Sequence, residues 1–174
     1  MQPSPVHIIE ATTAEQIDAA RTLFCEYATS LGWDLSDSRI AHEMALLPGP
    51  YAPPRGSLLV AYVGGVPAGA LGLQPVPEAC RIAGAGAETA GELKRLFVLP
   101  EFRRFGVGRA LMLRAESEAL ARGYDMLVLT TNAEMMPLAQ PLYESLGYAE
   151  SAPYRDDMVW PDLLWMRKSL AGTR

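Results

Sequence analysis

Apolar positions along this chain follow two different periods in turn. Short apolar runs bounded by Gly or Pro are typical of strands, and apolar positions spaced by three or four residues are typical of helices. The first pattern predicts strands over residues 6–11, 58–63, 66–73, 93–99 and 126–130, with final strands from Tyr148 onward and over 163–166. The second predicts helices over residues 12–32, from Ser36 or Asp37 to Pro48, from about Gly106 to Gly123, and from Pro137 or Pro141 to Gly147.

Turn and capping residues support the order of the first elements. Thr12-x-x-Glu15 is a capping box that opens the first helix. Gly64-Gly65 is a two-residue hairpin signal, so the strands beside it are expected to pair antiparallel. Residues 75–91 are irregular, and no helical pattern follows the Gly-Ala-Gly at 84–86, so we expect a mobile connection there rather than a phosphate loop.

A turn rich in Arg and Gly joins the strand at 93–99 to the following helix. Pro100 ends the strand, and Gly106 and Gly108 precede the helical pattern. The first turn of a helix has backbone N–H groups without partners and attracts anions, and glycine lets an anion approach the main chain closely. Cationic donors suited to phosphate oxygens are added by Arg103, Arg104 and Arg109. The order of strand, turn, cations and helix predicts a cradle for a diphosphate, although a ligand-free glycine turn or a solvated basic loop would explain each part alone.

Two other phosphate-binding motifs do not fit this segment. A P-loop needs Lys followed by Ser or Thr at the helix start, but Gly108 is followed by Arg109 and Ala110. A dinucleotide site needs a third glycine where this chain has Leu111. The strand, helix and strand over 93–130 instead predict a right-handed parallel crossover.

Two sequence landmarks resemble those of the GNAT-type N-acetyltransferases. Arg103-x-x-Gly106-x-Gly108 after a strand is similar to that family's acyl-CoA-binding signature, and the segment from Leu142 to Tyr148 (LYESLGY) is similar to its landmark near the C-terminus. The resemblance covers about residues 6–170. It implies a mixed α/β (α+β) fold with a mostly antiparallel central sheet, flanked by helices, in which two parallel strands splay apart around the pantetheine arm. It also implies acetyl-CoA, or a close acyl-CoA relative, as co-substrate.

The resemblance also assigns cofactor-binding positions. It implies that the main chain of Phe97 and Val98 pairs with pantetheine like an added strand, and that the Val98 N–H polarises the thioester carbonyl. The full set of expected cofactor-binding residues is Phe97, Val98, Arg103, Arg104, Phe105, Gly106, Val107, Gly108, Arg109 and Asn132.

Two residues are candidates for the proton transfers of acetylation. An amine acceptor arrives mostly as ammonium, with a pKa of about 10.4 if it is lysine-like, so a base or an ordered water must take a proton. The resemblance implies that Glu92 supplies this base, directly or through water; otherwise it is an edge carboxylate in solvent or paired with Lys94. Tyr143 is the candidate acid for the leaving thiolate, or else a tyrosine packed beside Leu142 and Leu146.

Prolines before Tyr143 affect this assignment. A proline inside a helix removes a hydrogen bond and costs about 3 kcal/mol, so Pro137 and Pro141 predict a helix that is kinked or begins late. The acceptor pocket is less determined by the sequence. Loop residues that could line it are Tyr51, Tyr154, Arg155 and Trp160.

Length and charge limit the function classes. The 174 residues fit a single domain, residues 1–174, with 49% hydrophobic content to form a core. A net charge of −5 disfavours nucleic acid and anionic membranes as partners and mildly favours a cationic acceptor, a small-molecule or peptide amine. Cys25 and Cys80 form no disulfide framework or zinc motif, no metal is expected, and the N-terminus has no targeting or spanning segment, which predicts a cytoplasmic protein.

The residues and the resemblance together lead to the hypothesis of an N-acetyltransferase that acetylates a primary amine by direct attack, without a covalent enzyme intermediate. The alternatives are a non-catalytic acyl-CoA sensor and an acyltransferase for a longer acyl group. The acceptor and the oligomeric state, including a homodimer, are left open by the sequence.

Overall fold

A seven-stranded sheet forms the centre of the computed structural model, which describes residues 5–77, 80, 82, 89–155, 162–170 and 172. The glycines at 84–86 and Trp160, singled out above, lie outside these residues. The strands are β1 Val6–Glu10, β2 Ser57–Val63, β3 Val66–Pro75, β4 Ala90–Val98, β5 Met126–Asn132, β6 Ala149–Glu150 and β7 Leu163–Ser169. The helices are α1 Ala14–Ser30, α2 Ser38–Ala45, α3 Val107–Ala121 and α4 Ala139–Ser145, with 3-10 turns η1 Gly49–Tyr51 and η3 Pro100–Phe102.

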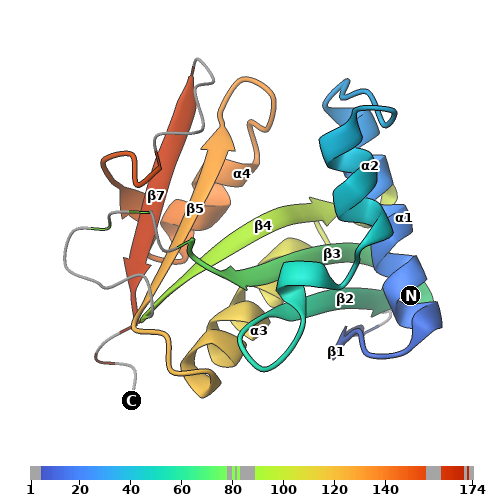
Figure 1. Ribbon diagram of the computed structural model, residues 1–174, viewed down its shortest axis with the longest axis horizontal. Coiled ribbons are helices and arrows are strands. Elements are labelled where there is room, and N and C mark those ends of the chain that lie inside the picture. Colours follow the sequence, from blue (N-terminus) through green and yellow to red (C-terminus); the bar gives the residue numbers. More distant parts are fainter. Residues whose placement is uncertain are drawn as a thin grey trace.

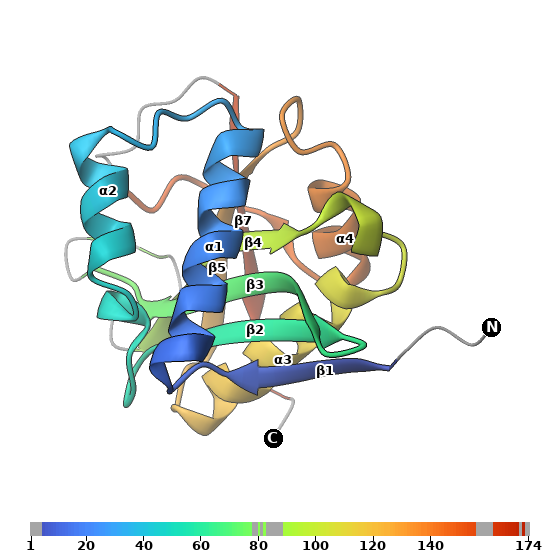
Figure 2. The ribbon, with the colours of Figure 1, turned by 90° about the vertical axis from the view of Figure 1, so that its right-hand side faces the viewer.

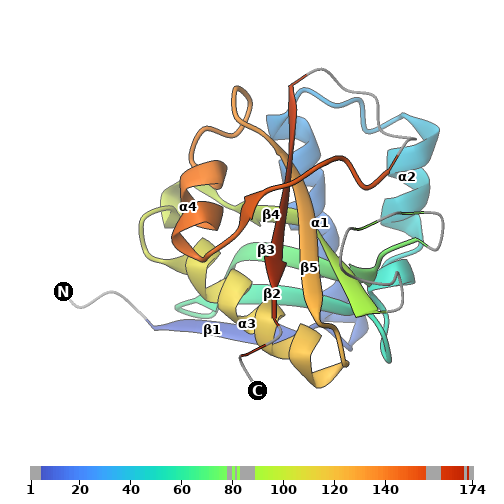
Figure 3. The same cartoon turned by 90° about the vertical axis from the view of Figure 1, so that its left-hand side faces the viewer.

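The strand order is β1-β2-β3-β4-β5-β7-β6, and every neighbouring pair is antiparallel except β4 and β5. This confirms the expected mixed, mostly antiparallel fold with one parallel pair. Helices α1 and α2 lie on one side of the sheet and α3 on the other, as Figures 2 and 3 show from opposite directions.

Strands buried on both faces produce a core on each side of the sheet. On β2, Leu58 and Val60 join the cluster under α1 and α2, whereas Leu59 and Ala61 join the cluster under α3. Successive side chains of a strand point to opposite faces, so one apolar run serves both cores. This is why the sequence shows short continuous apolar runs rather than strict alternation.

The parallel pair separates after three residues. Ala90, Gly91 and Glu92 of β4 pair with Met126, Leu127 and Val128 of β5, and β4 then continues to Val98 without β5 beside it. Figure 1 shows the two strands leaving a common point in different directions. The expected splay is therefore present, and it opens the sheet beyond Glu92.

A bulge in β4 lies beside this opening. Ala70 pairs with Phe97, but Gly72 pairs with Lys94, so β4 has one more residue than β3 between these pairs. Arg95 lies within the bulge at a φ of 61°, a left-handed conformation unusual for a side chain other than glycine. The bulge redirects the side chains of β4 where the site is formed.

Two local expectations are corrected by the structure. The capping box is Thr13 with Gln16, one residue later than expected, because Thr13 adopts the extended N-cap conformation and accepts from the Gln16 N–H. Neither proline is the first residue of the last helix, which begins late, at Ala139. Pro141 occupies its first turn, where a missing N–H removes no helical hydrogen bond.

Gly72 leaves room for a buried aromatic ring under the bulge. A Cβ at Gly72 would lie 2.5 Å from Cε1 of Tyr51, whose hydroxyl donates to Glu43 Oε1 over 2.9 Å. We expect Gly72→Ala to lower the free energy of unfolding by about 1–3 kcal/mol, measured by urea denaturation, because the fully buried ring cannot move freely. In a Tyr51→Leu background, Gly72→Ala should lower the free energy of unfolding clearly less than it does in the wild type. Equal effects in the two backgrounds would contradict the close contact between Gly72 and the Tyr51 ring.

Candidate active site

The turn between β4 and α3 presents unpaired backbone donors. Gly106 is the N-cap of α3 at a φ of 76°, and the first helical hydrogen bond runs from the Ala110 N–H to the Gly106 carbonyl over 2.9 Å. The Arg103 N–H donates to the Pro100 carbonyl over 3.2 Å. Within the described part of the chain, the N–H groups of residues 104–109 donate to no backbone acceptor. This arrangement is a helix N-terminus suited to anions.

Glycine is required at Gly106 and at Gly108 for different physical reasons. A Cβ at Gly106 would meet nothing within 4 Å, so its positive φ, not space, requires glycine. Gly108 has no positive φ, but a Cβ there would lie 3.3 Å from Leu142 Cδ2 and 3.7 Å from Val98 Cγ2. Gly108 therefore lets α3 pack closely against both β4 and α4.

The three arginines of the turn are engaged differently. Arg103 Nε donates to the Val98 carbonyl over 3.1 Å, and Arg109 Nη1 donates to Ser145 Oγ over 3.3 Å. Arg104 is exposed and makes no hydrogen bond or ion pair with the residues that the structure describes. Beside it, Phe105 is half exposed, whereas Val107 is buried in the core. Arg104 is thus the cation most available to a ligand.

The unpaired edge of β4 faces the opening of the sheet. The Leu99 N–H donates to the Ala68 carbonyl of the β3 side over 2.9 Å. Successive N–H groups of a strand point to opposite edges, so the Val98 N–H points away from β3. The Arg103 contact to the Val98 carbonyl lies on the same outer edge, in agreement with this direction.

Two adjoining cavities extend through the opening. The larger, about 560 Å³, is bounded by the turn, the end of β4 and the start of α4. The smaller, about 200 Å³, lies deeper, between β4 and β5. Both are lined by Tyr27, Leu31, Leu96, Met135 and Met136. These shared walls make the two cavities successive parts of one cleft, with the unpaired amides at its outer end.

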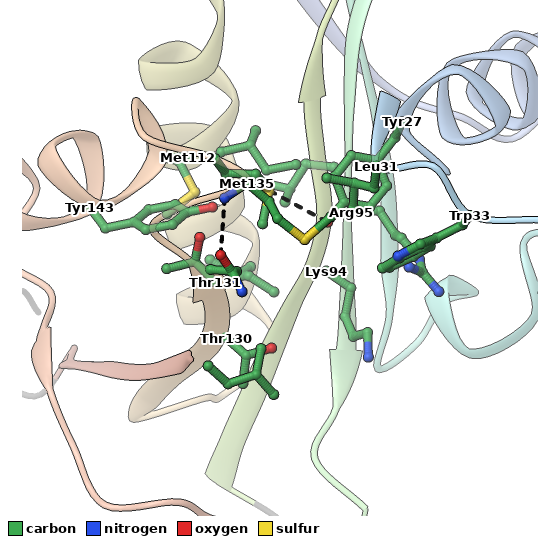
Figure 4. Close-up of a pocket in the computed structure, with 16 residues that line it drawn as sticks. Tyr27, Leu31, Trp33, Lys94, Arg95, Met112, Thr130, Thr131, Met135 and Tyr143 are labelled. Atoms are coloured by element: carbon green, nitrogen blue, oxygen red, sulfur yellow. Dashed lines mark hydrogen bonds between the residues drawn. The ribbon is translucent and has the colours of Figure 1, made fainter. Parts of the chain in front are cut away.

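Side chains from both sides of the separated strands line the inner cavity. Figure 4 shows Thr130, Thr131 and Tyr143 on one side of it, and Tyr27, Trp33, Lys94 and Arg95 on the other. The Thr131 hydroxyl is buried without a hydrogen-bond partner in the described part of the chain. A molecule bound in the cavity could satisfy it.

Comparison with known protein families identifies the family of this chain, because one family profile matches most of its residues. Residues 18–148 match the profile of the Acetyltransferase (GNAT) family. The chain belongs to this family. An uncharacterized N-acetyltransferase of Schizosaccharomyces pombe is 28% identical over 172 residues, which are 98% of this chain and 99% of that protein.

Solved structures share the fold of this GNAT chain. A GNAT-family acetyltransferase from Staphylococcus aureus superposes with a TM-score of 0.72 at 17% identity, over 95% of this chain and 99% of the other. A Salmonella typhimurium protein with its cofactor acetyl-CoA superposes with a TM-score of 0.65 at 22% identity, over 96% and 95% of the two chains.

Tyr143, the candidate acid, lies at the inner cavity of the cleft. Its side chain is only 6% exposed, packs against Tyr148 at a ring distance of 6.1 Å, and lines the inner cavity. Burial, with a smaller contribution from Tyr27, raises the pKa of the Tyr143 hydroxyl well above its usual range. The phenol therefore stays protonated and can donate a hydrogen bond, but burial makes it a weaker acid. Tyr143 therefore packs in the core and also borders the inner cavity.

Glu92 is buried at the point where β4 and β5 separate. It accepts from Gln74 Nε2 over 2.7 Å and from the Tyr154 hydroxyl over 3.0 Å, and it pairs with Arg155 Nη1 at 3.4 Å. The two alternatives of a solvent-facing carboxylate and a pair with Lys94 are therefore both wrong. Glu92 is 1% exposed and does not line either cavity, because the strands are still paired at this residue. Its role as a base stays a prediction.

The other expected site residues divide between the two cavities and the core. Phe97 is buried, with its ring 6.0 Å from that of Tyr27, and it borders the outer cavity. Asn132 borders the inner cavity instead of the outer one, and its Oδ1 accepts from the N–H groups of Glu134 and Met135, both over 3.0 Å. That side chain therefore holds the turn after β5.

Three of the loop residues expected at an acceptor pocket, Tyr51, Tyr154 and Arg155, border neither cavity of the cleft. Tyr51 is buried beside Glu43, and both Tyr154 and Arg155 are bound to Glu92. The cavity is instead lined by Tyr27, Trp33, Lys94 and Arg95, which were not expected there from the sequence. The available signal was the pair Lys94-Arg95 within an otherwise apolar strand, since charged residues are rarely buried without a partner.

Glu43 holds Arg95 in the bulge. Arg95 donates from Nε to Glu43 Oε1 over 3.1 Å and from Nη2 to Oε2 over 2.5 Å, and its guanidinium lies 5.0 Å from the Trp33 ring. Burial would raise the pKa of Glu43, but the hydrogen bonds and charge of Arg95 outweigh it and hold this pKa below its usual value.

Among the described residues, no helix combines the length and the apolar composition needed to cross a membrane. Among the same residues, no group of three or more His, Cys, Asp and Glu side chains could hold a metal ion.

The lowered pKa of Glu43 predicts how stability depends on pH. A carboxylate with a depressed pKa in the folded state stabilises the fold above its unfolded pKa of about 4.3, and this stability is lost as the pH falls through the folded value. We expect Glu43→Gln to cost about 2 kcal/mol at pH 7. The deficit should shrink as the pH falls below about 4.3 in urea titrations. Glu101→Gln, at an exposed position, is the control and should show no deficit, and a pH-independent deficit for Glu43→Gln would contradict the assignment.

Proposed function

We propose that this GNAT protein transfers an acetyl group from acetyl-CoA to the amine of a small acceptor by direct attack. The observation that carries the proposal is the single cleft between the separated strands, with unpaired amides at its outer end and a small enclosed cavity at its inner end. A long donor with a diphosphate at one end and a thioester at the other has the shape of this cleft. The S. typhimurium protein of the same fold, solved with acetyl-CoA, supports this choice of donor.

The outer end of the cleft would hold the donor. In the proposal, the N–H groups of residues 104–109 and the Arg104 guanidinium bind the diphosphate oxygens. The Val98 N–H, on the free edge of β4, would polarise the thioester carbonyl. The apolar residues shared by both cavities would enclose the pantetheine arm.

Transfer requires the acceptor nitrogen to attack the thioester carbon while the carbon–sulfur bond breaks. The amine becomes an amide and loses one proton, and the sulfur leaves as a thiolate. The Tyr143 hydroxyl, kept protonated by its raised pKa, would donate a hydrogen bond to that sulfur. Glu92, at the closed end of the opening, is the candidate proton acceptor through water, because it does not line the cavity itself.

Arg104→Glu tests the cradle. Arg104 has no partner among the described residues, so the substitution breaks no internal contact, and we expect acetyl-CoA affinity to fall by about tenfold, or about 1.4 kcal/mol, in isothermal titration calorimetry. Arg39→Glu makes the same change of net charge at an exposed position on α2 and should leave affinity unchanged. Equal affinities for the wild type and Arg104→Glu would exclude this guanidinium from the cradle.

Tyr143→Phe tests the role of the phenol in turnover. The hydroxyl makes no hydrogen bond with the described residues, so stability and the KM for acetyl-CoA should stay close to wild type, whereas kcat should fall by about tenfold or more. Tyr148→Phe is the control, because it removes the buried hydroxyl of the neighbouring tyrosine, whose ring does not line either cavity. Unchanged kcat in Tyr143→Phe, measured by release of the CoA thiol, would remove Tyr143 from the mechanism.

A further inference from the structure

Lys94 is half-buried, borders the inner cavity and makes no hydrogen bond or ion pair within the described part of the chain. Lys94 and Glu92 are two residues apart on β4 and share one face of the sheet, but Glu92 is held by Arg155, Gln74 and Tyr154. Glu43, the other nearby carboxylate, is occupied by Arg95. Both carboxylates that could neutralise Lys94 are therefore bound by other side chains.

The cavity itself has a positive charge balance. Among the residues that the structure describes, the sixteen that line it include Lys94 and Arg95 but no Asp or Glu. An ammonium removed from water is costly unless an anion or several acceptors replace its hydration. Burial lowers the pKa of Lys94, an effect to which Arg95 and Arg155 add and which Glu92 and Glu43 oppose. An anionic group bound in this cavity would therefore be stabilised by the positive charge of Lys94.

We propose that the acceptor carries a carboxylate beside its amine and that Lys94 binds this carboxylate in the inner cavity. The inference rests on the proposed acetyl transfer and specifies its substrate class as small amino acids. The carboxylate of such a molecule would face Lys94, and its amine would face the thioester end of the cleft. Lys94 is then a specificity-determining residue.

The size and the walls of the cavity narrow this class further. The volume of about 200 Å³ is below the range of roughly 300–1,000 Å³ typical of sites for drug-sized ligands, which favours a small acceptor. Most of its walls are apolar or aromatic, and they include Leu31, Trp33, Met112 and Tyr143. An amino acid with an apolar side chain matches both properties.

Arg95 supports the site but is less available than Lys94. Two hydrogen bonds to Glu43 and a cation–π contact with Trp33 hold its guanidinium, and the carboxylate largely neutralises its charge. The positive φ of Arg95 belongs to the bulge that redirects β4 beside Lys94. Arg95 therefore helps position the backbone, while Lys94 supplies the uncompensated charge.

Matched acceptors provide the first test. Thiol release from acetyl-CoA would be compared for leucine, methionine and phenylalanine and for the amide of each, which keeps the amine and side chain but lacks the carboxylate. We expect wild-type kcat/KM to favour the free amino acids by about ten- to a hundredfold. Lys94→Met should abolish this preference, Lys94→Arg should retain it, and Arg39→Gln, which also removes one charge, should leave it unchanged.

A binding measurement decides the inference independently of turnover. Isothermal titration calorimetry would measure the binding of N-acetyl-leucine and of N-acetyl-leucinamide, each with CoA present. These compounds are the products of acetylating leucine and its amide, and they differ only in having a carboxylate or an amide. Preferential binding of N-acetyl-leucine to the wild type, lost in Lys94→Met, would support a carboxylate site. Equal binding of both compounds, no binding of either at millimolar concentration, or a preference that survives Lys94→Met would overturn it. Absence of thiol release from every acceptor would instead contradict the proposed transfer, and the binding result would still decide the role of Lys94.

Discussion

The separation of β4 from β5 beyond Glu92 is the constraint on which the rest of the site depends. Parallel strands normally satisfy each other's backbone groups, but here only three residue pairs do so before the strands diverge. Beyond Glu92, the edge of β4 that faced β5 pairs with no other strand in the described part of the chain, and the Val98 carbonyl on this edge accepts from the Arg103 side chain. An edge of this kind is suited to an extended ligand that pairs like a strand.

The helix after β4 adds a second set of unsatisfied donors to the same cleft. Its N-terminal amides and the free edge of β4 lie at successive positions along one chain segment, so a ligand that follows the strand meets the helix N-terminus next. Close packing at Gly108 keeps α3 against β4 and α4. The geometry of the cleft therefore depends on backbone placement more than on any single side chain.

The sequence predicted the elements that depend on local chemistry. The apolar run before Pro100, the glycines at 106 and 108 and the helical spacing that follows were enough to place the strand, turn and helix, and the family landmarks added the splay. The one-residue error at Thr13 arose because two consecutive threonines can each begin a capping box, and only the backbone conformation selects between them. The surroundings of Glu92 could not be predicted, because Gln74, Tyr154 and Arg155 reach it from segments far apart in the chain.

The inner cavity was missed for a related reason. Long-range pairing decides which charges in a strand are neutralised, and the sequence alone suggested Lys94 as a partner for Glu92. In the folded chain Arg155 forms the ion pair with Glu92, and Glu43 of α2 forms one with Arg95. Lys94 is therefore left with the uncompensated charge. The net charge of −5 favours the approach of an amine, whereas the cavity favours a carboxylate. A free amino acid carries both groups, so the overall charge and the local charge are compatible with one acceptor.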